Sequence, residues 1–259
     1  MSIAGRGALM TGGGRGIGAA AARALADRGV RIVVSARSTD EIEAVAAELR
    51  ARGTEAWAVT CDVSEPADVA ALCREAAGRL GAVDILVNNA GVASSASVTR
   101  LALEEWTRLW TVNATGAFLA MQGVLPGMIE RGWGRIVNVA SVAALRGARY
   151  IGGYAASKHA LLGLTRSAAA EVAASGVTVN AVCPGYVDTP MTDATIANIV
   201  RRTGMEETAA LDAVLATTPQ RRLIAPEEVA AAVAFLCEET ARSINGQTVV
   251  LDGGATSAL

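Results

Sequence analysis

Short apolar runs alternate with longer stretches of helical periodicity along almost the whole chain. The apolar runs predict strands at 8–10, 30–35, 56–60, 83–87, 135–140, 177–183 and 248–251. Helical periodicity fills most of the intervals, with a long stretch at 103–128 and others at 154–174 and 226–238. This alternation is typical of βαβ units. We therefore expect an α/β fold: a single-domain, Rossmann-like, doubly wound parallel sheet of about seven strands with helices on both faces.

Several helix boundaries carry residues with clear capping preferences. Gly29 follows the first helix as a stop signal, and Ser38 with Glu41 has the pattern of a capping box for the second. Ser64 and Pro66 mark the start of the third helix. These signals divide the first third of the chain into regular units.

One segment, 189–222, has only weak helical periodicity and few apolar anchors. We interpret it as a mobile lid over a site. No shift in composition marks a boundary before or after it, and the chain contains no internal repeat. Residues 1–259 are therefore expected to form one domain.

Composition limits the classes of protein to which the chain can belong. Of its 259 residues 52% are hydrophobic and only 3% aromatic, so the core must consist largely of aliphatic side chains. The net charge of -2 gives no electrostatic basis for binding nucleic acid or an acidic membrane surface. No apolar run approaches the roughly 18 residues of a membrane helix, and no signal-peptide pattern is present. We expect a soluble, cytoplasmic protein.

The four cysteines, Cys61, Cys73, Cys183 and Cys237, lie far apart and form no C-x-x-C pair. This spacing favours neither a zinc site nor a disulfide framework. We expect four buried thiols in a reducing compartment, and no metal site.

Lys158 is the only lysine in the chain, whereas arginine occurs throughout. A chain that uses arginine for nearly every positive charge keeps lysine here, which indicates a need for a compact ammonium on a flexible stem. Tyr154 precedes it by four residues, so both side chains lie on one face of a helix. A phenol beside a positive charge loses its proton more readily than its free pKa of about 10 suggests. A surface lysine beside a core tyrosine is the alternative.

A glycine-rich turn, TGGGRGIG at 11–18, connects the first strand to the first helix. Its spacing does not fit the strict G-x-G-x-x-G pattern, and the informative glycines are Gly12, Gly16 and Gly18. In a strand-turn-helix, such glycines let the backbone approach a pyrophosphate, whose charge is held at the helix N-terminus. A tight turn without a ligand is the alternative reading.

The stretch after the second strand, 35–37, bears on which dinucleotide such a turn would hold. NAD-selective sites usually place Asp or Glu there, whereas this chain has Ser-Ala-Arg. Arg37 and Arg15 together suit the bidentate, charge-assisted binding of a 2′-phosphate. This favours NADP(H), with NAD(H) and a solvated Arg37 as alternatives. Asp62, after the third strand, is placed either to hydrogen-bond the adenine or to order a turn.

The sequence resembles the short-chain dehydrogenase/reductase family over essentially its full length, and in particular its 3-oxoacyl and polyketide-type ketoreductases. The resemblance rests on six motifs in the family's order: Thr11-Gly12-x-x-x-Gly16-x-Gly18, Asn88-Asn89-Ala90-Gly91, Asn113, Ser141, Tyr154-x-x-x-Lys158 and Pro184-Gly185. It implies an NAD(P)-dependent enzyme that acts on CH-OH groups.

The resemblance implies catalytic roles for four residues. Tyr154 is expected to be the general acid for reduction, or the base for oxidation, as hydride passes between nicotinamide and a carbonyl carbon. Lys158 is expected to bind the nicotinamide ribose and to lower the pKa of Tyr154. Ser141 is expected to hold the reacting oxygen. Asn113 is expected to bind a water that links Lys158 to solvent.

The resemblance also implies a larger cofactor-binding set. In the family, the loop at 88–91 packs beside the adenine-ribose side, and the turn at 184–185 bends around the nicotinamide. The full expected set is Gly12, Arg15, Gly16, Ile17, Gly18, Arg37, Asp62, Val63, Asn89, Ala90, Gly91, Tyr154, Lys158, Pro184, Gly185, Val187 and Thr189.

The substrate is less constrained than the reaction. Arg201 and Arg202 lie among apolar residues of the expected lid, which suits an acyl thioester with a phosphate group, or else a solvated helix face. Tyr150 and Tyr186 are candidates to line the pocket. We expect reduction of a 3-oxoacyl thioester, CoA- or carrier-protein-bound, or of a cyclic ketone.

Two other function classes stay open at this point. One is an NAD-dependent dehydrogenase that oxidises a free secondary alcohol, and the other is a non-catalytic dinucleotide-binding regulator. The second is disfavoured because Tyr154 and Lys158 are both present. The family resemblance further suggests a homotetramer, with the long helices around Asn113 and Tyr154 at one dimer interface.

Overall fold

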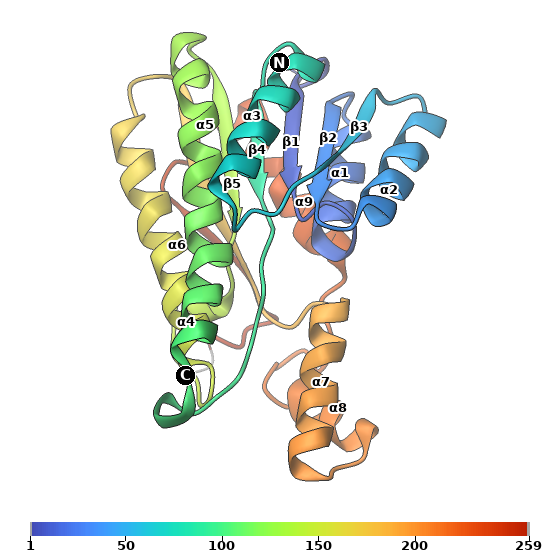
Figure 1. The fold of residues 1–259 in the computed structure, drawn as a ribbon, viewed down its shortest axis with the longest axis vertical. Coiled ribbons are helices and arrows are strands. Elements are labelled where there is room, and N and C mark those ends of the chain that lie inside the picture. Colours follow the sequence, from blue (N-terminus) through green and yellow to red (C-terminus); the bar gives the residue numbers. More distant parts are fainter. Residues whose placement is uncertain (1, 258–259) are drawn as a thin grey trace.

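Seven parallel strands form one sheet in the computed structural model, which describes residues 2–257. The strands are β1 (Gly7–Thr11), β2 (Arg31–Ala36), β3 (Ala56–Thr60), β4 (Ile85–Asn88), β5 (Gly134–Val139), β6 (Val177–Pro184) and β7 (Thr248–Leu251). They lie in the order β3-β2-β1-β4-β5-β6-β7 (Figure 1). The doubly wound sheet and all seven expected strands are confirmed, with ends shifted by at most two residues.

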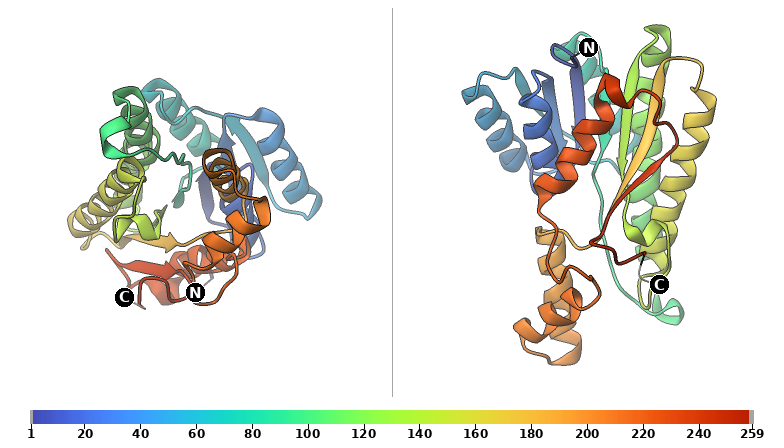
Figure 2. Two further views of the ribbon diagram at one scale, coloured as in Figure 1. Left: turned by 90° about the horizontal axis from the view of Figure 1, so that it is seen from below. Right: turned by 180° about the vertical axis from the view of Figure 1, so that it is seen from behind.

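Helices cover both faces of this sheet. One face is packed by α1 (Gly16–Ala26), α2 (Thr39–Ala51) and α9 (Pro226–Cys237), the other by α3 (Pro66–Leu80), α5 (Gly116–Glu130) and α6 (Gly152–Glu171). Figure 2 shows α9 lying across the sheet in the view from behind. Because both faces are covered, every residue of β1, β4, β5 and β6 is buried. The four cysteines are buried and unpaired, as expected.

The long helix expected at 103–128 is continuous over Leu103–Glu130. It consists of α4 (Leu103–Trp110), a π-helical turn at Thr111–Thr115 and α5. By length and composition alone this helix could cross a membrane, which corrects the expectation that no segment qualifies. A core helix passes the same test, and α5 packs against α3, β4 and β5.

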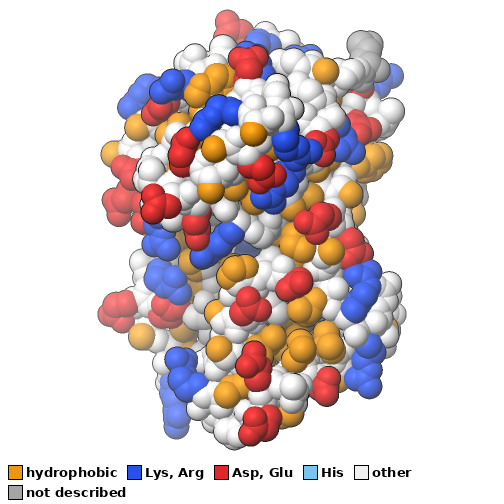
Figure 3. Space-filling view, turned by 90° about the vertical axis from the view of Figure 1, so that its right-hand side faces the viewer, with side chains coloured by type: hydrophobic (Ala, Val, Ile, Leu, Met, Phe, Trp, Pro, Cys, Tyr) orange, Lys and Arg blue, Asp and Glu red, His pale blue; other side chains and the backbone are white. Residues whose placement is uncertain are grey.

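The segment at 189–222 is mostly helical, although its periodicity is weak. It contains α7 (Pro190–Thr203) and α8 (Glu207–Leu215), which project beyond the carboxyl ends of the strands (Figure 1). Ile196 packs with Ala210 and Val214 in a small cluster of their own. In Figure 3, hydrophobic side chains gather over this lower part of the molecule. Because only a narrow strip of α7 and α8 is buried, the apolar periodicity of this segment is weak. Its role as a mobile lid stays a prediction.

Two expected helix starts differ in detail from the structure. Ser38 precedes α2, but its side chain makes no capping hydrogen bond, and Glu41 pairs with Arg15 instead. The capping-box prediction is therefore wrong, because a charge-assisted partner from the glycine turn holds the glutamate. At α3, Pro66 is the first helical residue, while the Ser64 hydroxyl donates to Asp62 at 2.7 Å.

Candidate active site

Tyr154 and Lys158 lie one turn apart on α6, beside the carboxyl end of β5. The Lys158 ammonium is 4% exposed, and its Nζ donates to the Val139 carbonyl oxygen at 2.9 Å. Nζ is 5.9 Å from the centre of the Tyr154 ring. The helix therefore presents both groups to one place, as their spacing predicts.

Burial dominates the protonation of both groups. It lowers the pKa of Lys158 from 10.5 to about 8, because a desolvated ammonium loses its proton more easily. Burial raises the pKa of Tyr154, and a hydrogen bond from Ser141 only partly opposes this shift. The lowered pKa expected for Tyr154 is thus not found in the protein alone. The ammonium is directed at the Val139 carbonyl oxygen, and the phenol is desolvated.

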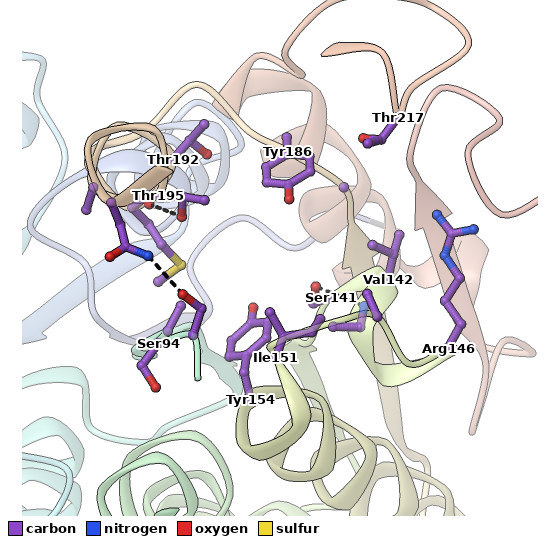
Figure 4. Close-up of a pocket in the computed structure, with 18 of the residues that line it drawn as sticks. Ser94, Ser141, Val142, Arg146, Ile151, Tyr154, Tyr186, Thr192, Thr195 and Thr217 are labelled. Carbon is purple, nitrogen blue, oxygen red and sulfur yellow. Dashed lines mark hydrogen bonds between the residues drawn. The ribbon is translucent and has the colours of Figure 1, made fainter. Parts of the chain in front are cut away.

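Ser141 ends the loop after β5 and opens a short 3-10 turn. Its hydroxyl accepts a hydrogen bond from the Ala143 amide at 3.1 Å, so it does cap a turn. The same hydroxyl also forms a hydrogen bond with the Tyr154 phenol that lowers the pKa of the phenol. In Figure 4 the Ser141 and Tyr154 side chains face one space. Both roles coexist, because a hydroxyl has one hydrogen and two lone pairs.

Asn113 lies in the π-helical turn at 111–115 and is 1% exposed. Its Oδ1 accepts from the Val92 amide at 2.8 Å, and its Nδ2 donates to the Val92 carbonyl oxygen and to Ser157 Oγ. The side chain thus holds the segment after β4 against α6. Its expected role in relaying protons through a water stays a prediction.

A cavity of about 660 Å³ opens in front of these groups. Ser141, Tyr154 and Tyr186 line its inner part, and the two tyrosine hydroxyls point into the same space in Figure 4. Arg201 and Arg202 line it from α7. Tyr186 therefore lines the cavity, as predicted. Tyr150, at 55% exposed, does not line this cavity.

The glycine turn is packed too tightly for side chains. A Cβ at Gly18 would stand 2.1 Å from the Gly12 carbonyl oxygen, and Gly12 and Gly16 have φ values of 64° and 51°. Asn89 Nδ2 donates to the Gly12 carbonyl oxygen at 2.8 Å and so ties the turn to the loop after β4. These glycines are required by close approach and by left-handed backbone. The turn also opens α1, whose free N–H groups suit a pyrophosphate.

The nicotinamide end of the expected site also comes together. Pro184 ends β6, and Gly185, which follows it, lines the cavity. Thr189 comes within 3.0 Å of the place where a Gly16 side chain would begin. A Cβ at Gly91 would lie 3.5 Å from Lys158 Nζ. The glycine turn, the loop after β4 and the segment after β6 thus lie close to one another and to Lys158, an arrangement that suits a dinucleotide.

Other members of the expected set lie at the edges or behind this surface. Ile17 packs against the core on the α1 face, and Val187 is 4% exposed. The Ala90 amide donates to the Thr11 hydroxyl oxygen at 3.2 Å. Val63 is buried, and its carbonyl oxygen leaves no room for a side chain at the start of α5. These residues lie mostly beneath the surface on which we expect the dinucleotide to bind.

Four charged side chains lie where the sequence leads us to expect the adenosine end of a cofactor. Arg15 pairs with Glu41 at 3.0 Å, and Arg37 pairs with Asp62 at 3.8 Å. Asp62 Oδ1 also accepts from the Ser64 amide at 2.9 Å, so it orders a turn, which was the alternative considered for it. Its contact with an adenine stays a prediction.

Two features near the reacting groups are not evident from the motifs. Ser157 Oγ donates to the Tyr154 carbonyl oxygen at 2.8 Å and accepts from Asn113, which fixes α6 against the π-helical turn. Ser95 accepts hydrogen bonds from Asn198 and Arg202 of α7, which ties the expected lid to the loop after β4. The only sequence signal for the contacts of Ser157 is a polar residue three positions after Tyr154. No local signal indicates the contacts of Ser95. Among residues 2–257, no group of three or more His, Cys, Asp or Glu side chains could hold a metal ion.

A family model described as short chain dehydrogenase matches residues 6–199. The match includes the glycine turn, the loop at 88–91 and the pair of Tyr154 and Lys158. The chain belongs to the short-chain dehydrogenase family. The resemblance inferred from the six motifs is thereby confirmed.

Known members of the family match this short-chain dehydrogenase along nearly its whole length. D-beta-hydroxybutyrate dehydrogenase of Rhizobium meliloti (strain 1021) is 38% identical over 255 residues, which cover 96% of this chain and 98% of that protein. The 3-oxoacyl-(acyl-carrier-protein) reductase FabG of Vibrio cholerae serotype O1 is 39% identical over 254 residues, or 98% of each chain. The crystal structure of a variant of actinorhodin polyketide ketoreductase with NADPH has a TM-score of 0.93 at 39% identity and covers 96% of this chain and 97% of its own.

These similarities place this short-chain dehydrogenase among enzymes that interconvert keto and hydroxyl groups. The expected likeness to 3-oxoacyl and polyketide ketoreductases is confirmed. The protein is therefore an oxidoreductase, and the arrangement of Ser141, Tyr154 and Lys158 is its candidate reaction centre.

Proposed function

We propose that this short-chain dehydrogenase reduces a ketone with NADPH, in a reversible reaction whose substrate is a 3-oxoacyl thioester or a cyclic ketone. The observation that carries the proposal is the cavity that joins Ser141 and Tyr154 to a basic rim at Arg201 and Arg202. Similarity to a 3-oxoacyl reductase and to a polyketide ketoreductase with NADPH supports it.

The residues around the cavity divide the chemistry among them. Bound NADPH supplies the hydride. Tyr154 donates the proton that the carbonyl oxygen needs as negative charge develops on it. Ser141 hydrogen-bonds the same oxygen and stabilises that charge. Lys158, held by the Val139 carbonyl oxygen, lies on the same helix face as the phenol and would bind the nicotinamide ribose of the cofactor.

The shape and charge of the cavity support an acyl thioester. A volume of about 660 Å³ suits a substrate larger than a simple alcohol. Arg201 and Arg202 have no carboxylate within 4 Å among the described residues. Guanidinium groups at the rim suit the phosphate of a CoA or carrier-protein arm.

A substrate panel tests this proposal. NADPH consumption should be fastest with 3-oxoacyl thioesters or cyclic ketones, and slow with small unbranched ketones that fill little of the cavity. A thioester that lacks the phosphate arm should lose binding, and Arg201→Gln with Arg202→Gln should abolish that difference. Equal rates for all ketones would contradict the substrate class while leaving the reaction class intact.

A second candidate function is oxidation of a free secondary alcohol with NAD. Similarity to D-beta-hydroxybutyrate dehydrogenase favours it. It differs from the first in direction, cofactor and substrate size. NADH bound at least about tenfold more tightly than NADPH would support it.

The cofactor proposal predicts a switch in preference for the variant Arg37→Asp. NADPH affinity should fall at least about tenfold, because a charge-assisted partner of the 2′-phosphate becomes a carboxylate of the same sign as the phosphate. NADH affinity should stay within a few-fold. Isothermal titration of both cofactors measures this. The control is Arg74→Asp, an exposed arginine on α3. An unchanged cofactor preference would show that Arg37 does not contact the 2′-phosphate.

The assembly and location inferred from the sequence stay proposals. A homotetramer would cover apolar side chains that the chain alone exposes on α4 and α5, such as Leu103 at 71%, Phe118 at 43% and Ile129 at 46%. The enzyme would work in the cytoplasm, without nucleic acid or membrane as partner.

A further inference from the structure

Two ion pairs occupy the place where the adenosine 2′-phosphate would bind. Arg15 of the glycine turn pairs with Glu41, in the first turn of α2, at 3.0 Å. Arg37, after β2, pairs with Asp62, after β3, at 3.8 Å. Two guanidinium groups and two carboxylates leave this end of the site without net charge. The arginines that favour a phosphate are therefore already engaged.

Glu41 is held against the glycine turn by packing as well as by charge. A Cβ at Gly14 would stand 2.9 Å from Glu41 Cβ and 3.3 Å from its Oε2. The carboxylate thus lies over the turn, at the side where Arg15 reaches out. Glu41 also lies in the first turn of α2, at the helix end that carries partial positive charge. The carboxylate of Glu41 therefore stands beside the proposed phosphate subsite.

We propose that Glu41 is a specificity-determining residue that limits the preference of this enzyme for NADP(H) over NAD(H). Arg15 donates to Glu41 through Nη1. A 2′-phosphate that binds Arg15 must therefore share the guanidinium with Glu41, and the two anions repel each other. A 2′-hydroxyl has no such requirement and can donate a hydrogen bond to the carboxylate. Glu41 thus disfavours one cofactor selectively. The inference rests on the proposed binding of NADP(H).

Asp62 is the weaker competitor of the two acids. Its distance to Arg37 is 3.8 Å, beyond hydrogen-bond length, whereas Arg15 donates to Glu41 Oε1 at 3.0 Å. Asp62 Oδ1 is also occupied by the Ser64 amide and hydroxyl. Removing Asp62 would therefore disturb the turn before α3. Removing the charge of Glu41 breaks no capping hydrogen bond, because α2 has none from a side chain.

Calorimetric titration of the full chain with NADPH, NADH, 2′,5′-ADP and 5′-AMP tests the proposal. Glu41→Gln should bind NADPH and 2′,5′-ADP at least about fivefold more tightly, and NADH and 5′-AMP within about twofold of the unsubstituted protein. The matched control is Glu43→Gln, two positions along the same helix, which pairs with Arg50 instead. It should leave all four affinities unchanged.

A double-variant cycle shows whether Glu41 acts through Arg15. When Arg15 is already replaced by Gln, Glu41→Gln should raise the affinity for 2′,5′-ADP by less than half as much as it does when Arg15 is present. Weaker NADPH binding by Glu41→Gln, or an equal gain for 2′,5′-ADP and 5′-AMP, would overturn the proposal.

The cofactor proposal and the role of Glu41 can fail separately. If the unsubstituted protein does not discriminate 2′,5′-ADP from 5′-AMP but Glu41→Gln does, the role of Glu41 is supported and the natural preference for NADP(H) is wrong. If neither protein discriminates, both are wrong.

Discussion

Replacing Tyr154 with phenylalanine should lower the turnover number at least about a hundredfold, because the general acid contributes a factor of about 10² to 10⁴ in rate. The ring and its packing stay, so NADPH affinity should change by no more than a few-fold. Steady-state rates with the best ketone, together with cofactor titration, measure the two effects separately. Ser141 alone should not replace the phenol, since an aliphatic hydroxyl is a far weaker acid than a phenol.

The chain offers a matched control in Tyr150, which lies four residues earlier and outside the cavity. Its hydroxyl accepts only a long hydrogen bond from Arg149, at 3.4 Å. Tyr150→Phe should therefore keep the full rate. A near-normal rate in Tyr154→Phe would remove the phenol from the chemistry and would leave Ser141 to account for proton transfer.

Substituting arginine for Lys158 should lower kcat/KM at least about a hundredfold, although the charge is kept. Lys158 is only 4% exposed, so a larger, planar guanidinium would have to displace the groups around it. Its five N–H donors would meet one carbonyl oxygen, that of Val139. An arginine variant with nearly full activity would reduce the lysine to a simple positive charge.

The pH dependence of Lys158 provides an independent measurement. As the only lysine, it gives a single side-chain resonance in lysine-labelled protein, and this should titrate near pH 8 in the absence of cofactor. The unfolded chain keeps the ordinary lysine pKa, so between about pH 8 and 10.5 it binds more protons than the folded protein. The free energy of unfolding should therefore rise with pH across this window, relative to Lys158→Met. A resonance that titrates near 10.5 would contradict the burial effect.

Local patterns in the sequence were sufficient to predict the strands of the sheet and the relative positions of Tyr154, Lys158 and Ser141. Buried parallel strands read as continuous apolar runs, so their number and positions could be predicted, whereas their order in the sheet comes from the structure. Tyr154 and Lys158 share a helix, so their four-residue spacing alone puts them on one face. Ser141 follows β5, and carboxyl ends of parallel strands meet at one edge of the sheet.

Contacts between distant segments could not be predicted in the same way. Glu41 fits a capping box by spacing, and only the approach of Arg15 from the glycine turn reveals another partner. The pairing of Ser95 with α7 joins residues about a hundred positions apart and has no local signature. The pKa of Tyr154 was expected to fall because of a nearby charge. Desolvation dominates instead, and burial depth cannot be derived from spacing.

The single lysine, 4% exposed at the reaction centre, also decides how the protein responds to amine-directed acylation. Among residues 2–257 such reagents have no side chain to modify on the surface, so they will not map contacts with neighbouring molecules. Acylation of Lys158 instead requires that its surroundings open and that its ammonium be deprotonated. The rate of that reaction would time the opening of the reaction centre, and a bound dinucleotide should slow it.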